Sequence, residues 1–423
     1  MSTRIVTRSR IALWGGCLAL AFALPLVFKS GFLVSLLCQI GIMVVFALSY
    51  NMLLGQTGLL SFGHAVYYGL GAFATMHALN ALGKAADPLA VALLPLSGGL
   101  AGAAAGIVLG YVTTRKAGTT FAMITLGIGE MVAACSLMFP AVFGGEGGVS
   151  GNRAAGKATF LGLTWGPQVE MYGLIVLWAF AASVAMYALT QTPLGRIANA
   201  VRDNPERAEF VGYDTERVRF LMVILSGFFA GIAGGLTALN YEIVTAETLN
   251  AHTSGIVLLI AFVGGIGFFY GPIIGAILVT VMQIVIGGLT HAWLLYFGLF
   301  FLFMVLVAPG GIASVIAMQR GLWQAGLLGR LLPYYLAAAL PLAVLLAGLI
   351  GLVELSYALL GGEGGEADAA ARVLGMSLQV RSAGPWLGAL ALAAAGMATM
   401  HWVRVRARAS WNAALATLHG DRR

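Results

Sequence analysis

Apolar runs of about 20 residues recur along this chain, and each is long enough to cross a bilayer as an α-helix. Residues 292–309 (AWLLYFGLFFLFMVLVAP) are one such run. Only 9% of the 423 residues are charged, whereas soluble domains carry about 25%. Because too little charge is present to coat a water-facing surface, the sequence predicts an all-α, polytopic membrane protein.

The apolar runs predict about ten helices in a membrane core and about two more near the C-terminus. We therefore divide the chain into a membrane core, residues 1–312, and a C-terminal membrane extension, residues 313–423, for which the sequence suggests no role. The expected core spans are residues 11–28, 32–54, 59–80, 89–112, 119–141, 171–190, 220–242, 253–269, 271–290 and 292–309, and the two later spans are 333–353 and 384–402.

Basic residues predict which loops face the cytoplasm, because Lys and Arg accumulate on that side of membrane proteins. If the N-terminus lies inside and each span crosses once, most of the 23 Lys and Arg fall on the cytoplasmic side. Both termini and the polar loop 191–219 are then cytoplasmic. The basic residues are dispersed among hydrophobic segments, which argues against binding to nucleic acid and for a chain embedded in the lipid bilayer.

A polar, glycine-rich break interrupts the apolar sequence at residues 50–73 (YNMLLGQTGLLSFGHAVYYGLGAF). Irregular backbone is tolerated at membrane depth only where protein or a water-filled cavity surrounds it. The break is therefore either part of a solute pathway or an ordinary loop at the membrane surface. The candidate pathway residues are Gly55, Gln56, Gly58, Ser61, Gly63 and His64. A buried structural role suits His64 at least as well.

Glu130 is the one acidic residue deep in an expected span, and ionisable groups inside a membrane are expensive. It either pairs with a neighbouring helix or lines the solute pathway. A second glycine-rich break, residues 263–275 (VGGIGFFYGPIIG), favours a tight cytoplasmic turn over a cavity lining. Glycines at every fourth position in residues 98–110 and 227–235 predict faces on which helices pack closely.

The longest polar stretch expected inside, residues 191–219, predicts two short helices. Thr192 and Asn204 suit N-caps, and a proline follows each of them at the first helical position. Gly212 suits a left-handed helix termination. The positive and negative charges of the loop balance, which favours a docking surface for another protein over a surface for anionic lipid. A solvated connector is the alternative.

No set of residues has the spacing expected for catalysis or metal binding. The three cysteines lie singly in apolar runs, which is not typical of a disulfide framework or a metal site. The segment GNRAAGKA, residues 151–158, has the glycine and lysine spacing of a phosphate-binding loop, but Ala158 replaces the expected hydroxyl residue. We therefore expect no catalytic residue, no metal and no cofactor bound by this chain.

Several stretches together resemble the permease family of branched-chain amino-acid ABC transporters, in particular the member that pairs with a second, related permease. The likeness spans about residues 10–312. The stretches that carry it are GQTGLLSFGHAVYYGLGAF at 55–73, TTFAMITLGIGEM at 119–131, TPLGRIANAVRDNPERAEFVGYDTERVRFLMVILSGFFAGIAGGL at 192–236, and VGGIGFFYGPIIGA at 263–276.

The resemblance implies a permease subunit of an ATP-driven importer in the bacterial inner membrane, not an enzyme. Its implied partners are two ATP-binding subunits, which would use ATP and magnesium, a second related permease subunit and a periplasmic solute-binding protein. The family's cytoplasmic coupling helix carries over to Pro193, Arg196, Arg202, Asn204, Ala208, Glu209 and Gly212. Phe210 and Val211 depart from the pattern common at this place in ABC importers.

The implied solute is a branched-chain amino acid or a similar small polar solute, such as urea, an amide or a small organic acid. A stand-alone channel or secondary transporter is the alternative, and it requires solute flux without ATPases. A membrane scaffold without a passage is a third reading, against which the polar breaks argue.

Overall fold

The computed structural model describes residues 8–28, 30–83, 87–156, 164–290, 292–324, 328–360, 370–373, 376–380 and 382–420. Lys157 and Ala158 of the rejected phosphate-loop segment lie outside these residues. The chain forms two compact units, each described here by itself. Unit 1 contains residues 1–286 and 300–313, and unit 2 contains residues 287–299 and 314–423. The predicted boundary at residue 312 stays a prediction.

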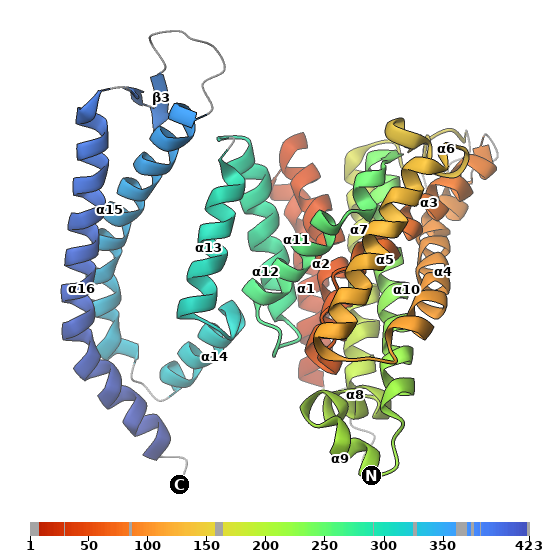
Figure 1. Cartoon of the computed structure of the whole chain (residues 1–423), viewed down its shortest axis with the longest axis horizontal. Helices are drawn as coiled ribbons and strands as arrows, with labels where there is room; N and C mark the ends of the chain where they lie inside the picture. The colour runs from red at the N-terminus through yellow and green to blue at the C-terminus, as the bar shows by residue number, and fades with distance from the viewer. Residues whose placement is uncertain are drawn as a thin grey trace. The chain divides into compact units, whose positions relative to one another are not determined.

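Unit 1 is a bundle of helices with very little strand (Figure 1). Its helices are α1 (Arg8–Val27), α2 (Gly31–Thr57), α3 (His64–Leu82), α4 (Pro88–Thr113), α5 (Gly118–Met138), α6 (Pro140–Phe143), α7 (Gln168–Gln191), α8 (Pro193–Asp203), α9 (Pro205–Phe210), α10 (Thr215–Tyr241), α11 (Ala251–Gly264) and α12 (Gly271–Val281). Short 3₁₀ segments η2 (Gly145–Gly147) and η3 (Ala246–Leu249), a π-helix η4 (Met282–Ile286), and an antiparallel pair of strands, β1 (Val149–Ser150) and β2 (Ile243–Val244), complete it.

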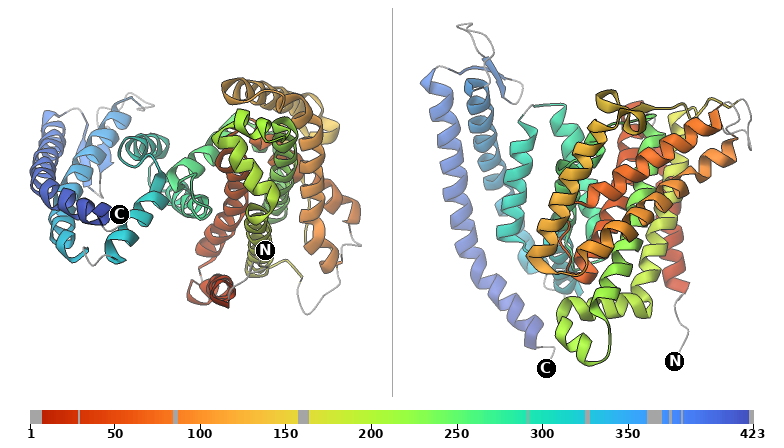
Figure 2. Two further views of the ribbon diagram at one scale, coloured as in Figure 1. Left: turned by 90° about the horizontal axis from the view of Figure 1, so that it is seen from below. Right: turned by 45° about the vertical axis from the view of Figure 1, so that its right-hand side comes forward.

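The later helices are α13 (Trp293–Val307), α14 (Gly311–Gln324), α15 (Leu328–Leu360) and α16 (Ala383–Gly420). The long helices α15 and α16 lie side by side in both views of Figure 2. They pack closely because Gly348 faces Ala393 and Gly396 faces Leu345. The strands β3 (Ala370–Val373) and β4 (Met376–Gln379) form an antiparallel hairpin between them.

Seven of the described helices are long and apolar enough to cross a membrane, namely α2, α4, α5, α7, α10, α15 and α16. The bent pair α13 and α14, with an angle of 47°, counts as an eighth. The all-α membrane class is confirmed, but some expected spans are shorter than predicted. Residues 253–269 and 271–290 form α11, of 14 residues, and α12 with its π-turn, whereas a crossing helix needs about 20 residues.

Glycines bring α4 and α10 into direct backbone contact, as their four-residue spacing predicts. A methyl group added to Gly227 would lie 2.7 Å from the carbonyl oxygen of Gly102. One added to Gly231 would collide with the carbonyl oxygen of Gly98. Such close approach increases van der Waals contact, which drives helix association in lipid. The α4–α10 pair is therefore a rigid part of unit 1.

We expect Gly231→Ala to destabilise the protein by about 1–3 kcal/mol, because the added methyl group has no room between the two backbones. Gly127→Ala is the matched control, since nothing lies within 4 Å of a methyl group there. Thermal unfolding in detergent measures both variants. Equal melting temperatures for the two would contradict the close packing of α4 on α10.

Candidate functional site

The predicted glycine break is a loop between α2 and α3 that lies inside the bundle. Gly58 ends α2 in the left-handed conformation, with φ 69°, and α3 begins at His64. The Oγ atom of Ser49 lies 3.0 Å from Nε2 of His64. Ser49 precedes the end of α2 by eight residues, or about 12 Å of helix. The chain therefore turns back into the bundle over residues 58–63, so this irregular segment is at membrane depth.

Hydrogen bonds tie this loop to three neighbouring helices. The backbone N–H of Phe62 donates to Oγ1 of Thr125 on α5, at 3.2 Å. The N–H of Ala65 donates to Oγ of Ser254 on α11, at 2.9 Å. The hydroxyl of Tyr50 on α2 donates to the carbonyl of Ser61, at 3.1 Å. These contacts join α2, α5 and α11. We call the last two turns of α2, the loop 58–63 and the first turn of α3 the α2–α3 junction.

His64 is fully buried in the junction among aromatic side chains. Its ring stacks on Phe46 at 5.4 Å and meets Tyr50 and Tyr67 edge-on. Gly63 is also buried, and a methyl group there would collide with the carbonyl oxygen of Thr125. The structure therefore brings the predicted residues together as a packed junction. Their predicted contact with solute stays a prediction.

Several buried polar atoms of this region have no hydrogen-bond partner among the described residues. Buried polar groups in folded proteins are nearly always paired, so each exception calls for a physical reason. These atoms remain available for hydrogen bonds in a different arrangement of the same helices. The unpaired atoms are Oδ1 of Asn51, Oε1 of Gln56, Oγ of Ser61 and Nδ1 of His64.

Glu130 does not join the junction. Its neighbour Gly129 faces Gly63, at 3.3 Å for an added methyl group, but Glu130 itself is exposed. Met123 and Met131 are exposed on the same helix. No described residue forms an ion pair or hydrogen bond with the Glu130 carboxylate. Both predicted roles of Glu130, pairing with a neighbouring helix and lining the solute pathway, stay predictions.

The helices α8 and α9 form as the sequence predicts. Oγ1 of Thr192 accepts a hydrogen bond from the N–H of Gly195 at 3.3 Å, and Oδ1 of Asn204 accepts one from Arg207 at 2.9 Å. Both caps precede a proline at the first helical position. Gly212 ends the segment with φ 95°. The pair lies at one end of the bundle, which we call the α8 end (Figure 2).

Arg202 connects this pair to the α2–α3 junction. Its guanidinium Nη1 donates to the carbonyl of Gly55 in the last turn of α2. Its side chain also covers Gly58, where an added methyl group would lie 3.0 Å from Cγ. Asp203 holds the other side of the guanidinium, with 2.9 Å between Nη2 and Oδ1. The α8–α9 pair and the α2–α3 junction, which were predicted separately, thus meet at the Arg202 side chain.

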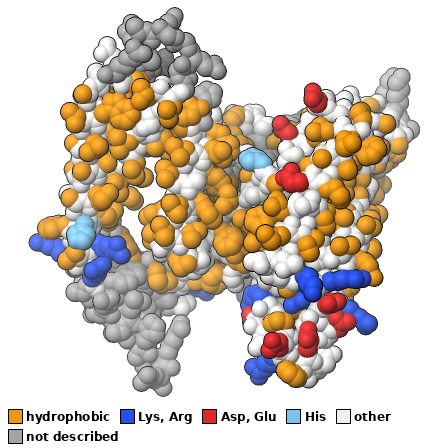
Figure 3. Space-filling model, viewed as in Figure 1, with side chains coloured by type: hydrophobic (Ala, Val, Ile, Leu, Met, Phe, Trp, Pro, Cys, Tyr) orange, Lys and Arg blue, Asp and Glu red, His pale blue; other side chains and the backbone are white. Residues whose placement is uncertain are grey.

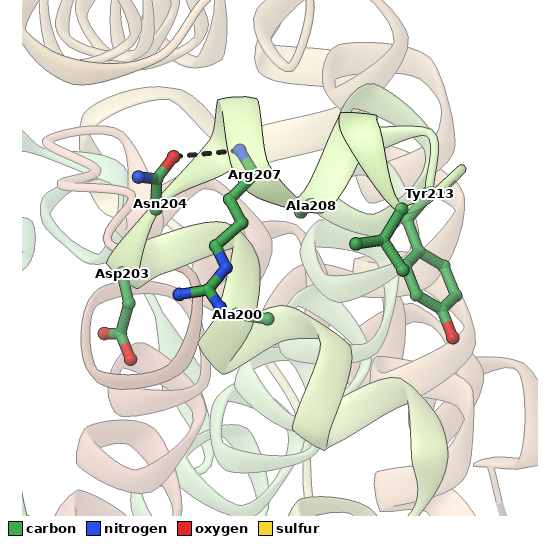
Figure 4. A pocket seen from close by; sticks show the side chains of 7 residues that line it. Ala200, Asp203, Asn204, Arg207, Ala208 and Tyr213 are labelled. Carbon is green, nitrogen blue, oxygen red and sulfur yellow. Dashed lines mark hydrogen bonds between the residues drawn. The ribbon is translucent and has the colours of Figure 1, made fainter.

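The tip of α9 carries exposed apolar side chains on an otherwise charged surface. Phe210 is 90% exposed and Val211 is 71% exposed. A pocket of about 330 Å³, lined by Ala208 and Val211 among others, lies there, and Figure 4 shows Arg207 and Tyr213 on opposite sides of it. Figure 3 shows acidic and basic side chains mixed around this end. Glu209 points elsewhere, since its Oε1 accepts a hydrogen bond from Thr215.

A second irregular segment at membrane depth was not predicted. After β2 the chain turns back into the bundle over residues 245–250, and Leu249 packs on Gly69 of α3. Gly69 lies thirteen residues, or about 20 Å, before the end of α3. A polar cavity of about 460 Å³ lies there. The sequence signal is the polar run TAETLN, whose length also suits an ordinary outer loop.

Arg153 anchors the turn that leads into this segment, and no sequence signal indicated that role. It is 7% exposed, and its guanidinium donates to the carbonyls of Trp165 at 2.6 Å and Leu239 at 2.7 Å. It also donates to the carbonyl of Asn240 at 3.0 Å. Oε1 of Glu242 accepts from the backbone N–H of Arg153 at 2.9 Å. Arg153 therefore caps the C-terminal end of α10.

The chain matches the family model described as "Branched-chain amino acid transport system / permease component" over residues 32–309. The chain belongs to this family. The match covers the junction, α8, α9 and the polar cavity. Residues 310–423, with α14, α15 and α16, lie beyond it.

Known relatives of this permease differ in the solutes that their names give. It is 28% identical to the high-affinity branched-chain amino acid transport system permease protein LivM of Escherichia coli, over 71% of this chain and 74% of LivM. It is 26% identical to the fructose import permease protein FrcC of Rhizobium meliloti, over 43% of this chain and 52% of FrcC. A guanosine ABC transporter permease protein of Bacillus subtilis, NupQ, is 28% identical over 23% of this chain and 30% of NupQ. No solved structure matches the permease.

We expect Arg153→Lys to destabilise the permease by about 2 kcal/mol, because one ammonium cannot reach all the carbonyls that the guanidinium binds. Arg217→Lys is the control, since the Arg217 side chain is 84% exposed and pairs with Asp214, and exposed pairs contribute little. Thermal unfolding in detergent gives the comparison. A melting temperature unchanged by Arg153→Lys would contradict the capping role.

Proposed function

We propose that this chain is a permease subunit of an ATP-driven importer for branched-chain amino acids or similar small polar solutes in the bacterial inner membrane. The family match and the long alignment with LivM support this proposal. The structural observation that carries it is the Arg202 contact, because it joins the exposed pair α8–α9 to the last turn of a long membrane helix. A coupling element needs such a connection.

The proposed importer contains two ATP-binding subunits, a second related permease and a periplasmic solute-binding protein. The ATP-binding subunits use ATP and magnesium, and this chain supplies the passage. Both termini and the α8 end lie in the cytoplasm, as the distribution of Lys and Arg favours. The exposed apolar tip, Phe210 and Val211, then faces the ATP-binding subunit. Apolar side chains left exposed among charged ones are typical of a protein interface.

The contacts suggest how movement of an ATP-binding subunit reaches the membrane helices. A displaced α9 moves α8, and the guanidinium of Arg202 then pulls on the carbonyl of Gly55. The junction next to it has unpaired polar atoms, so a second arrangement can form hydrogen bonds that this one lacks. ATP drives transport when the ATP-bound subunits bind one of the two arrangements more tightly than the other.

The second permease gives Glu130 a partner. An exposed carboxylate in the middle of an apolar membrane helix is costly in lipid. We therefore place the exposed face of α5, which carries Met123, Glu130 and Met131, against a polar group of the second permease. The alternative of a stand-alone channel or secondary transporter needs none of these partners.

We expect Phe210→Asp to release the ATP-binding subunits, because a charge cannot enter an apolar docking site without losing its hydration. Co-purification of these subunits with the tagged permease measures the effect. Ile243→Asp is the control, since Ile243 is also an exposed apolar residue but lies in β2, away from the α8 end. Retention of the subunits by Phe210→Asp would place their docking site elsewhere.

Arg202→Ala tests the coupling step separately from docking. We expect the ATP-binding subunits to stay bound, whereas solute uptake falls about tenfold relative to ATP hydrolysis, because the link to Gly55 is lost. Arg217→Ala is the control at an exposed surface pair. Vesicles that contain the complete importer give both rates. Full uptake by Arg202→Ala would exclude this route of coupling, and flux without any ATPase would favour the channel alternative.

A further inference from the structure

Five elements of unit 1 line the polar cavity of about 460 Å³. Helix α2 contributes Gln39 and Met43, and α3 contributes Tyr68. The irregular segment 245–250 contributes Glu247, and α11 and the π-helix η4 complete the lining. Most of these side chains carry amide, hydroxyl or charged groups, in a chain that is 60% hydrophobic. So polar a lining within a membrane bundle needs an explanation beyond packing.

The backbone around the cavity is irregular in two independent ways. Residues 245–250 form no α-helix and contain only the short 3₁₀ segment η3. Irregular backbone in a membrane bundle is tolerated where a water-filled cavity adjoins it. Gln283, also in the lining, belongs to the π-helix Met282–Ile286. Single π-turns in membrane or soluble helices occur frequently at functional sites. The two irregularities meet at the same cavity, although they are far apart in the sequence.

The cavity offers one acidic group and one cluster of free backbone donors. The Glu247 carboxylate is exposed to the cavity and has no ion pair or hydrogen bond with a described residue. Helix α11 begins at Ala251 beside the cavity, and no described side chain caps it. The backbone N–H groups of Ala251 and His252 donate to no described residue. The N-terminus of a helix attracts anions through such groups.

We propose that this cavity is a solute-binding site for a small zwitterion, with the ammonium group on the carboxylate of Glu247 and the carboxylate at the N-terminus of α11. Met43 and Ile256 lie in the same lining and provide an apolar surface for an aliphatic side chain. Helix ends inside a membrane bind the anionic groups of solutes in this way in other transporters. The inference rests on the proposed importer function and adds the site and its recognition chemistry.

The charges of the site discriminate among the solutes named for the relatives. A sugar such as fructose has no ammonium group, so it leaves the Glu247 carboxylate unpaired. A simple carboxylate is repelled by Glu247, and a simple amine leaves the α11 N–H groups unpaired. Among these solutes, only a zwitterion pairs both the Glu247 carboxylate and the α11 N–H groups, and leaving a charged group unpaired costs binding energy.

The test is equilibrium binding of radiolabelled L-leucine to the permease–ATPase complex in lipid nanodiscs, without the solute-binding protein. We expect Glu247→Gln to weaken binding about tenfold or more, because a charge-assisted hydrogen bond is lost. Glu146→Gln, an equal change at an exposed acid of η2, should leave it unchanged. Ile256→Trp, which fills the cavity, should abolish binding, and gel filtration checks that each variant is folded.

Competitors test the chemistry of the site. 4-Methylpentanoate lacks the ammonium group of leucine, isoamylamine lacks the carboxylate, and both should compete weakly. Equal competition by fructose, native affinity in Glu247→Gln, or no leucine binding to the native complex at millimolar concentration would each overturn the proposal. ATP-driven uptake by the complete importer is measured in parallel. If ATP-driven uptake persists in any of those cases, only the proposed binding site is overturned. If ATP-driven uptake is absent, the proposed importer function itself is overturned.

Discussion

In the hydrocarbon core of a bilayer, every backbone polar group must find its hydrogen-bond partner within the protein or in a water-filled cavity. This constraint explains the least regular parts of unit 1. The loop 58–63 meets it through side chains of other helices, Thr125 among them. The end of α10 meets it through Arg153, which reaches the carbonyls of Leu239 and Asn240. The N–H groups of Ala251 and His252 at the N-terminus of α11 have no partner among the described residues, and they adjoin the polar cavity.

Some parts of the bundle are packed backbone to backbone, whereas others keep polar atoms without a hydrogen-bond partner among the described residues. At the α4–α10 contact the backbones touch at Gly102 and Gly227, so no side chain can repack there. A close-packed interior resists continuous deformation. At the α2–α3 junction, by contrast, Gln56 and His64 keep unpaired polar atoms. We therefore infer that a conformational change keeps α4 and α10 as a fixed frame and rearranges the junction.

Features that depend only on neighbouring residues, such as helix caps, were predicted from the sequence. Thr192 and Asn204 act as caps because their short polar side chains reach the N–H groups of the next turn, and this needs no tertiary information. The role of Arg153 depends on the contact between the start of α7 and the end of α10. These helices are far apart in the sequence, so no residue spacing reveals the role. The length of α11 was also hidden, because an apolar run that ends inside a bundle has the same composition as one that crosses a membrane.

The two irregular segments at membrane depth are not separate features. Ser254 lies in the first turn of α11, directly after the cavity residues His252 and Thr253, and its hydroxyl accepts from Ala65 at the start of α3. Contacts therefore run without interruption from Arg202 through the α2–α3 junction to the N-terminus of α11. A rearrangement that displaces Ala65 must move the helix end that faces the cavity or break the Ala65–Ser254 hydrogen bond. Because the proposed site uses that helix end, its affinity for solute would then depend on the position of α8.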